Sequence, residues 1–418
     1  MKWTKNLFFF ILSLSFNHLT ELDDDCFVGI EESLDILELS FAFATDVFPE
    51  RALRPLSNLL WLVLDNNNFQ TIETTAFYSF QQLRYINLES NRLHYLPERI
   101  FLSSVHPELR DVKLGYNFLE AIPESSFHNL TELRSLDLTG NRITVLTSGS
   151  ILDCPKLVTI SLAYNRIHKT EKNAFYGLSS LRFLHLEFNK LVVLDLDAIS
   201  EIGETLRKQS FHGLDSLQTL DLSGNDITQL STEQFRNLKS LRILNLSSNK
   251  IRSLPRDVFE GTKLEMLDLS HNKFTVVPSP SFLEVGYTLR DLNMADNFVD
   301  HLDSTAFPTS QLVSLNLAQN RLTILPDNSF VSLGKLLSLN VSQNILQANF
   351  KELFHYLPDL RQLYLSNCGL RDVPLLPLTN LNVLDLSFNY IVLMHVLGFK
   401  KYKKTVLLLK LGDFKHES

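Results

Sequence analysis

The side chains that come nearest to a chemical site are His185 and Glu187, which stand two positions apart and would project from the same face of a strand. An imidazole and a carboxylate could together hold a metal ion, but protein zinc sites use three or four side-chain ligands. The sequence offers no third ligand beside this pair. We therefore expect ordinary exposed polar residues here, with no metal and no other cofactor.

Signatures of the common enzyme classes do not occur in the sequence. It has no phosphate-binding P-loop, no G-x-G-x-x-G after a strand, no H-E-x-x-H and no nucleophile elbow. The net charge is −8 and apolar residues make up 44%, which argues against a nucleic-acid-binding polycation and against a disordered polyanion. We expect no catalytic residues, no small-molecule substrate and no nucleic acid partner.

The cysteines are too few and too scattered to organise the fold. Cys26, Cys154 and Cys368 are odd in number and far apart in the chain. They match neither a disulfide framework nor a metal cluster with the usual ligand spacing. The fold must therefore be stabilised by packing and backbone pairing.

The start of the chain has the features of a secretion signal. Two lysines precede the apolar run 7–16 (LFFFILSLSF), which suits a signal-peptide core but is too short to span a bilayer core of about 30 Å. We assign 1–20 as a signal peptide, with a buried terminal strand or helix as the alternative, and 21–33 as a degenerate N-terminal segment. No later segment reads as a membrane anchor, so the sequence predicts an extracellular or cell-surface protein.

Three N-x-S/T acceptors agree with export, and we predict N-glycosylation at Asn129, Asn245 and Asn340. Asn245 and Asn340 fall in a column of strand residues. Glycans there would obstruct the C-terminal half of the sheet. Asn129 falls on a return limb, where a glycan would be tolerated.

A repeat of about 24 residues decides the fold. The pattern L-x-x-L-x-L-x-x-N-x-L recurs through the chain with its asparagines mostly 24 apart, and a weaker copy with Ala42 in the asparagine place precedes them. A phenylalanine follows ten residues after most of these asparagines, so two independent markers stay in phase. The asparagines are Asn67, Asn91, Asn117, Asn141, Asn165, Asn189, Asn225, Asn249, Asn272, Asn297, Asn320, Asn344 and Asn389, and Cys368 takes the place in one further copy.

Each repeat predicts a short strand, a turn and an irregular or short-helical return limb. Strands bury their leucines only when neighbours stack on both sides, which gives an α/β leucine-rich-repeat solenoid (a horseshoe) with a parallel sheet on its concave face. The asparagine amide both donates and accepts hydrogen bonds and would satisfy backbone groups at the turn. A thiol does this poorly, so we expect a looser turn at Cys368.

The repeats number about 15 over 34–399, and their register breaks in two places. Asn189 and Asn225 are 36 apart, which places a charged loop insertion near 195–210. The tail 400–418 lacks a recognisable cap, and we interpret it as truncated, with one last strand formed around 406–411. Solenoids need capped ends to cover the last apolar layer.

Aromatic residues gather in the N-terminal half of the predicted concave face. Exposed aromatic side chains are enriched at protein interfaces because they bury a large area at low entropic cost. We therefore predict a protein-binding surface here, with packing among the rings themselves as the alternative. Its members are Trp61, Tyr85, Tyr116, Tyr164, Phe183, His185 and Phe188.

The repeats resemble those of extracellular leucine-rich-repeat proteins. The segment from Leu93 to Asn117 (LHYLPERIFLSSVHPELRDVKLGYN), which belongs to the repeat with a 26-residue spacing, is similar to the chaoptin family of invertebrate photoreceptor adhesion proteins. The resemblance implies cell–cell adhesion, with self-association as one form of contact, although chaoptin-like proteins carry more repeats and a lipid-anchored end. Two other classes remain open: the ligand-binding ectodomain of a Toll-like receptor and a soluble matrix-binding protein of the small proteoglycan kind.

Overall fold

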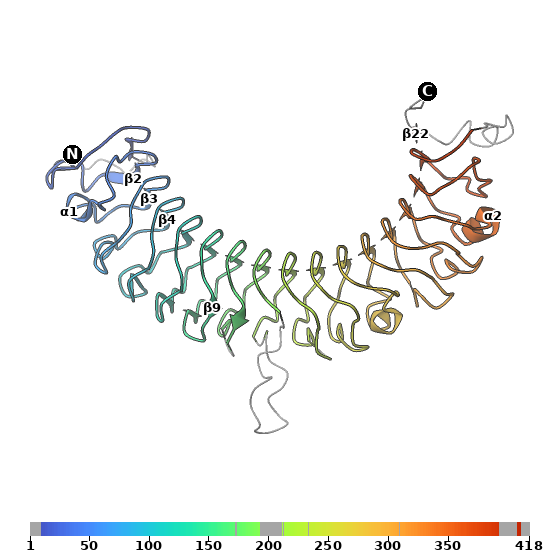
Figure 1. Cartoon of the computed structure of the whole chain (residues 1–418). Helices are drawn as coiled ribbons and strands as arrows, with labels where there is room; N and C mark the ends of the chain where they lie inside the picture. Colours follow the sequence, from blue (N-terminus) through green and yellow to red (C-terminus); the bar gives the residue numbers. More distant parts are fainter. Residues whose placement is uncertain are drawn as a thin grey trace, which may run out of the picture. The chain divides into compact units, whose positions relative to one another are not determined.

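The computed structural model describes residues 10–171, 174–192, 211, 213–232, 234–308 and 310–392, together with the backbone of 408–410. The chain divides into two compact units, unit 1 (Met1–Leu220) and unit 2 (Asp221–Ser418). In each unit, successive repeats stack side by side, with their strands on the inner side of the curve and their return limbs on the outer side (Figure 1). Each unit is therefore the predicted solenoid, with a parallel sheet as its concave face.

The sheet of unit 1 takes one strand from each repeat. Its strands pair in parallel in chain order, with one register shift, between Phe10 and Ile11. They are β1 (Phe10–Ser13), β2 (Leu34–Glu38), β3 (Trp61–Val63), β4 (Tyr85–Asn87), β6 (Asp111–Lys113), β8 (Ser135–Asp137), β11 (Thr159–Ser161) and β13 (Phe183–His185).

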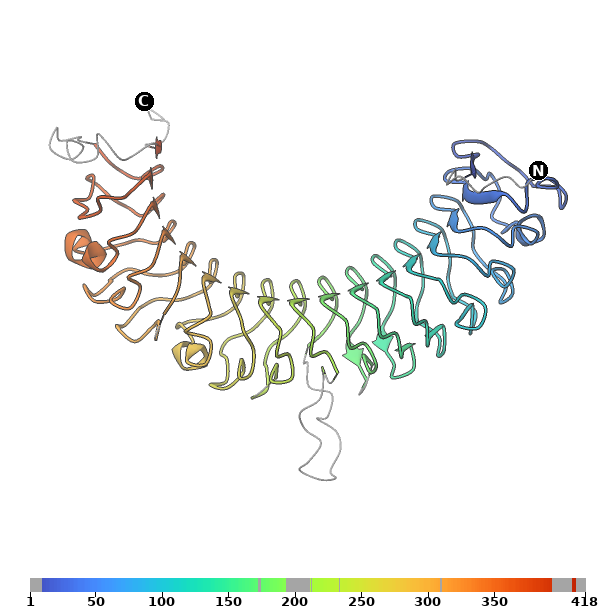
Figure 2. The same ribbon diagram turned by 180° about the vertical axis from the view of Figure 1, so that it is seen from behind.

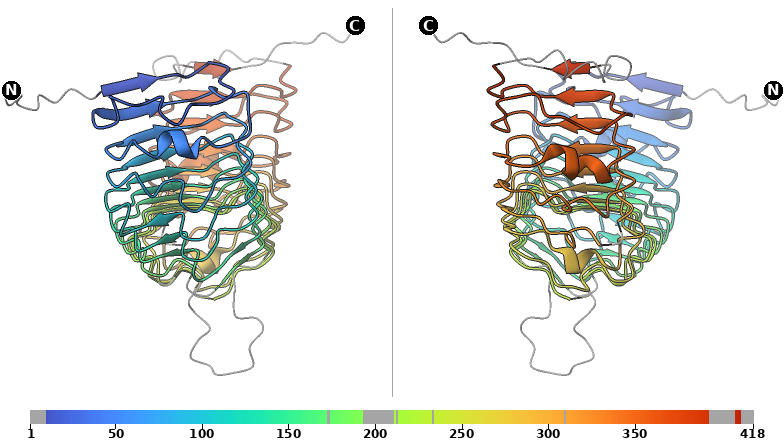
Figure 3. Two further views of the ribbon diagram at one scale, coloured as in Figure 1. Left: turned by 90° about the vertical axis from the view of Figure 1, so that its left-hand side faces the viewer. Right: turned by 90° about the vertical axis from the view of Figure 1, so that its right-hand side faces the viewer.

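Unit 2 is built in the same way, and its successive strands pair in parallel. In the right-hand view of Figure 3 its later strands lie one above another. The final strand, formed by 408–410, pairs with the one before it and agrees with the predicted last strand around 406–411. The strands are β15 (Ile243–Asn245), β16 (Met266–Asp268), β17 (Asp291–Asn293), β18 (Ser314–Asn316), β19 (Ser338–Asn340), β20 (Gln362–Tyr364), β21 (Val383–Asp385) and β22 (Leu408–Lys410), while β14 (Thr219–Asp221) contains the boundary between the units.

The return limbs carry more regular structure than the sequence predicted. In unit 1 they form a three-stranded parallel sheet and a two-stranded one, because repeats of nearly equal length bring the same positions into register. Each unit also has a short α-helix, α1 in unit 1 and α2 in unit 2; α2 is seen from behind in Figure 2. The elements are β5 (Phe101–Leu102), β7 (Phe127–His128), β10 (Ile151–Leu152), β9 (Val145–Leu146), β12 (Lys169–Thr170), α1 (Glu50–Leu53), α2 (Phe350–Leu353), η1 (Ser279–Phe282) and η2 (Phe354–Tyr356).

The core has two layers of side chains. In the three-residue strands from β3 to β21 the central residue faces inward and is buried, as are the apolar residues on either side of the strand. Phenylalanines line the return side, where the ring centroids of Phe77 and Phe101 lie 5.6 Å apart and those of Phe330 and Phe354 lie 6.3 Å apart. Such close ring packing stabilises neighbouring repeats against each other.

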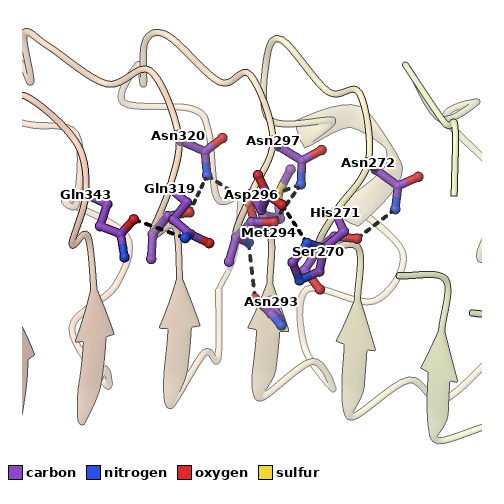
Figure 4. Close-up of polar contacts among 12 residues, drawn as sticks. Ser270, His271, Asn272, Asn293, Met294, Asp296, Asn297, Gln319, Asn320 and Gln343 are labelled. Atoms are coloured by element: carbon purple, nitrogen blue, oxygen red, sulfur yellow. Dashed lines mark hydrogen bonds and ion pairs between the residues drawn. The ribbon is translucent and has the colours of Figure 1, made fainter. Parts of the chain in front are cut away.

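The repeat asparagines hold the turns together. Asn297 is typical: its amide nitrogen donates to the carbonyls of Leu269, Met294 and Ala295 at 3.0–3.2 Å, and its amide oxygen accepts the N–H of Phe274 at 3.1 Å. Figure 4 shows Asn272, Asn297 and Asn320 in equivalent places in successive repeats. Twelve of the thirteen asparagines are buried, and Asn389 is half-buried. Each one therefore joins its own repeat to the preceding repeat.

At Cys368 two groups share the role of the amide. The thiol lies 3.4 Å from the carbonyl oxygen of Val341, and the backbone carbonyl of Cys368 accepts the N–H of Leu346 at 3.1 Å. Gly369, the next residue, has a φ of +73°, a left-handed conformation that glycine adopts without strain. The turn keeps its partners, but it relies on a weaker donor.

Three sequence predictions concern the two ends of the chain and the insertion that breaks the repeat register. Residues 10–13, inside the predicted signal peptide, form the first strand of the unit 1 sheet, so the secretion signal stays a prediction. The insertion near 195–210 lies outside the described residues. So does the tail 400–418, apart from the backbone of its last strand.

Candidate interaction surface on unit 1

A sharp corner follows every strand of the repeats. The residue directly before the turn asparagine has a positive φ, near +55° in most repeats, and its N–H donates to the next repeat. A left-handed backbone costs a residue with a side chain roughly 1–2 kcal/mol. The repeated hydrogen bonds hold the corner in that conformation and turn its side chain outward.

In unit 1 five of these corners are aromatic: Phe16 and Phe41 near the start of the chain, and three more further along it. Tyr116, Tyr164 and Phe188 are 55%, 54% and 47% exposed. The rings of Tyr164 and Phe188 are stacked with centroids 4.6 Å apart. Between Tyr116 and Tyr164 the corner residue is Gly140, and the ring of Tyr116 lies against it. We call Tyr116, Tyr164 and Phe188 the corner row.

Unit 2 differs at the same corners. There the side chains are mostly polar, and Figure 4 shows His271 beside Asp296 and Gln319 donating to Gln343. The distance is 2.6 Å between His271 Nδ1 and Asp296 Oδ2 and 3.0 Å between the two glutamine amides. Phe388, which is 77% exposed, is an aromatic exception among the corners of unit 2. What distinguishes unit 1 is that several of its corners are aromatic.

A second aromatic group lies on the strands. Trp61 on β3 and Tyr85 on β4 occupy paired positions, and their rings stack with centroids 4.8 Å apart. Trp61 is 45% exposed. Burial raises the pKa of the Tyr85 hydroxyl, against the opposing effect of Lys113, so the hydroxyl remains a neutral donor at physiological pH. We call this pair the strand stack.

The remaining predicted members, Phe183 and His185, lie on β13. Phe183 is exposed at the start of the strand, and His185 Nδ1 lies 3.7 Å from Glu187 Oε2. Across the described ranges of the chain, no group of three or more His, Cys, Asp or Glu residues is placed to hold a metal ion. The seven predicted residues thus form the strand stack, the corner row and a smaller group on β13, all within unit 1.

The three glycosylation acceptors differ in their surroundings. Asn129 is exposed on a return limb, with a φ of +56°. Asn245 and Asn340 face the concave side of unit 2 and are half-buried, and the Asn245 amide nitrogen donates to Asp221 at 3.0 Å. We expect Asn129 to be the most accessible acceptor.

Sequence reasoning missed two aromatic corner residues and one buried histidine. Phe41 occupies the corner of the first weak repeat and stacks on Phe16 at 5.2 Å. His106 is buried in the 26-residue repeat, where Nδ1 accepts the N–H of Leu102 and Nε2 donates to the carbonyl of Phe77 at 2.9 Å. Burial lowers the pKa of His106, against the two backbone hydrogen bonds. The sequence signal for this local turn around His106 was the length of the repeat, which exceeds the usual 24 residues by two.

Comparison with known proteins defines the class of protein. The Leucine rich repeat family description matches overlapping stretches that together span 32–103, 107–286 and 287–370. The chain therefore belongs to the leucine-rich-repeat family. In the described segments, no helix is long and apolar enough to cross a membrane.

Similarity to individual proteins is partial. The chain is 30% identical to mouse Toll-like receptor 7 over 31% of its length and 29% identical to Drosophila melanogaster chaoptin over 32%, matches that cover 12% and 8% of those proteins. In the glycosylated Drosophila Toll–Spatzle complex, a chain shares the fold with a TM-score of 0.79 at 21% identity, over 96% of this chain and 54% of that one. The chain thus matches only a small part of these curated relatives.

Proposed function

We propose that the chain is a protein-binding module of the cell surface that acts in cell–cell adhesion, including contact between copies of itself. The observation that carries the proposal is the corner row together with the strand stack. These groups place four aromatic side chains that are 45–55% exposed on one unit, together with the less exposed Tyr85. Such side chains supply binding energy at protein interfaces when a partner covers them.

Two features support a role in binding. The sheet of unit 1 is stitched at every corner by backbone and asparagine hydrogen bonds, so the aromatic groups stand on a rigid support. A preorganised surface loses little entropy when it binds. Leucine-rich-repeat proteins act mainly through such surfaces, and we propose that this chain is not an enzyme.

A receptor ectodomain is the alternative function, favoured by the similarity to Toll-like receptor 7 and by the shared fold with a chain of the Toll–Spatzle complex. It predicts tight capture of a soluble ligand by isolated protein. A matrix-binding protein is a third possibility and predicts binding to matrix components. Adhesion predicts association between surfaces that each carry many copies.

The test is expression of the tagged full chain in an invertebrate cell line, followed by bead aggregation with purified protein. Medium, surface-labelled and internal fractions are compared first, with and without removal of N-glycans. Glycosylated protein in the medium or on the surface, with coated beads that clump together, supports the proposal. Coated beads that bind neither each other nor cells rule out adhesion by this chain.

A further inference from the structure

A row of cationic side chains borders the sheet of unit 1 at the start of its strands. The residue before the strand is arginine in four repeats and valine in one, Val158. Backbone bonds between successive members of the row keep them one repeat apart, a spacing of about 4.8 Å in a parallel sheet. With Lys156, the row has five cations and two nearby glutamates in a chain whose net charge is −8. The cations are Arg84, Arg110, Arg134, Lys156 and Arg182, and the nearby carboxylates are Glu108, Glu132 and Asp111.

The first two arginines share one carboxylate, so only half of their charge is compensated. Glu108 Oε2 lies 3.8 Å from Arg84 and 3.6 Å from Arg110. Further along the row, Glu132 pairs with Lys156 at 2.5 Å. Neither Arg134 nor Arg182 has a carboxylate within ion-pair distance in the portion of the chain that is described.

A groove opens where valine interrupts the row. It has a volume of about 270 Å³ and is lined by Arg134, Lys156, Val158, Ser180, Arg182 and Ser216. Val158 is shorter than the arginines before and after it, and this leaves the space between the two unpaired guanidinium groups. Ser180 and Ser216 add two hydroxyl groups to its lining.

The lining specifies an anion with several acceptor oxygens. Two guanidinium groups and two hydroxyls can donate from successive repeats, while the Lys156 ammonium is already paired with Glu132. A carboxylate has two oxygens to offer, whereas a sulfate ester has three free oxygens. We propose that this groove binds a sulfate ester of an acidic polysaccharide.

This inference goes beyond the proposed adhesion and uses different residues from the corner row and the strand stack. Binding to a sulfated chain would hold the protein at a cell surface or in the matrix. Polysaccharide binding can therefore be absent while coated beads still aggregate, and it can be present when they do not.

The test measures binding of the purified full chain to a heparin-derived octasaccharide at 0.15 M salt, with the desulfated octasaccharide as the negative probe. R134Q/R182Q removes the two unpaired cations and should weaken binding about tenfold. R84Q/R110Q removes the same charge from the paired part of the row and should change it less than about twofold. Equal weakening by the two variants would show that only diffuse charge acts, and would overturn the site.

The Val158→Arg variant gives a second test, in which a positive charge is added rather than removed. It adds a positive charge but fills the groove with a side chain that four other repeats accommodate at this position. The proposal predicts weaker binding, whereas attraction by net charge alone predicts tighter binding. Tighter binding of a phosphoserine peptide than of the octasaccharide, lost in R134Q/R182Q, would overturn the assignment to a sulfated polysaccharide.

Discussion

The ring of Tyr116 lies so close to Gly140 that a Cβ atom on this glycine would sit 2.7 Å from Tyr116 Cδ1. Gly140 occupies the left-handed corner of its own repeat, with a φ of +70°. The missing side chain therefore serves both the corner and the ring beside it. The corner row depends on this contact between neighbouring repeats.

Substitution of Gly140 by alanine should disturb both functions of this residue. We expect Gly140→Ala to lower the free energy of unfolding by roughly 1–2 kcal/mol from the left-handed backbone, and to displace the Tyr116 ring. Denaturant unfolding measures the first effect, and bead aggregation measures the second. Gly369→Ala is the control, since its φ is +73° but its added Cβ meets only ordinary contact, 3.7 Å from Ile345. Equal aggregation by the two variants would contradict a role for Tyr116.

The repeat asparagines should contribute far more to stability than other polar side chains of the sheet. Asn297→Ala leaves buried carbonyls without a donor and should lower the free energy of unfolding by roughly 2–4 kcal/mol. Asn316→Ala is the control: its side chain is half-buried and its oxygen accepts the N–H of Ala318. A loss of about 1 kcal/mol or less is expected there.

Cys368 in the asparagine place should be the weak member of the series. Cys368→Ala should cost about 1 kcal/mol, because a thiol is a weak donor and the backbone carbonyl of Cys368 keeps its partner, Leu346. Denaturant unfolding of the two alanine variants in parallel checks the order. A loss as large as that of Asn297→Ala would show that the thiol acts as strongly as the amide.

The cysteines should react in two classes. Burial raises the pKa of Cys154 and of Cys368 to about 11, so both remain protonated and shielded at neutral pH. Cys26 is exposed. Maleimide labelling of native protein at pH 7.5 should modify Cys26 alone, and labelling in denaturant should modify all three. Rapid native labelling of Cys154 would mean that its repeat opens readily.

His106 should make the protein less stable in mild acid. Because burial lowers its pKa in the folded chain below the ordinary value of 6.5, the unfolded chain binds the proton more readily as the pH falls through 6.5. Its contribution is therefore complete above pH 6.5 and is lost as the pH falls toward the folded value.

Unfolding measured between pH 7.5 and 5 provides the check for His106. His106→Gln should have a shallower loss of stability with falling pH than the unmodified chain. His355→Gln, at an exposed position, should keep the original slope. Parallel slopes for the unmodified chain and His106→Gln would show that this imidazole is not the group responsible.

The repeat was fully readable from the sequence because its two markers, asparagine and phenylalanine, recur in phase. The position of Phe330 against Phe354 and the bonds of Asn297 follow directly from that register. The corner conformation was not readable, because residues as different as Tyr164 and Asp296 adopt it. Its cause is the hydrogen bonding between repeats rather than a local preference.

The candidate site was predictable only in part for the same reason. The strand column places Trp61 and Tyr85 on one face, and their stacking agrees with the alternative of packing among the rings. The contact of Tyr116 with Gly140 depends instead on side-chain direction at a corner. The groove at Val158 needed the pairing of Glu108 with two arginines to be known. Ion pairs between repeats are set by side-chain geometry that periodicity does not contain.

The most direct test of adhesion through unit 1 is bead aggregation with Trp61→Ala/Tyr164→Ala, which takes one ring from the strand stack and one from the corner row. The control is Tyr95→Ala/Tyr176→Ala, which removes two rings of similar exposure, 55% and 50%, from the return limbs. All four side chains are exposed, so both variants should unfold at nearly the same denaturant concentration as the unmodified chain. We predict that the first variant no longer clumps beads and that the control clumps them normally. Normal clumping by the first variant would contradict the account.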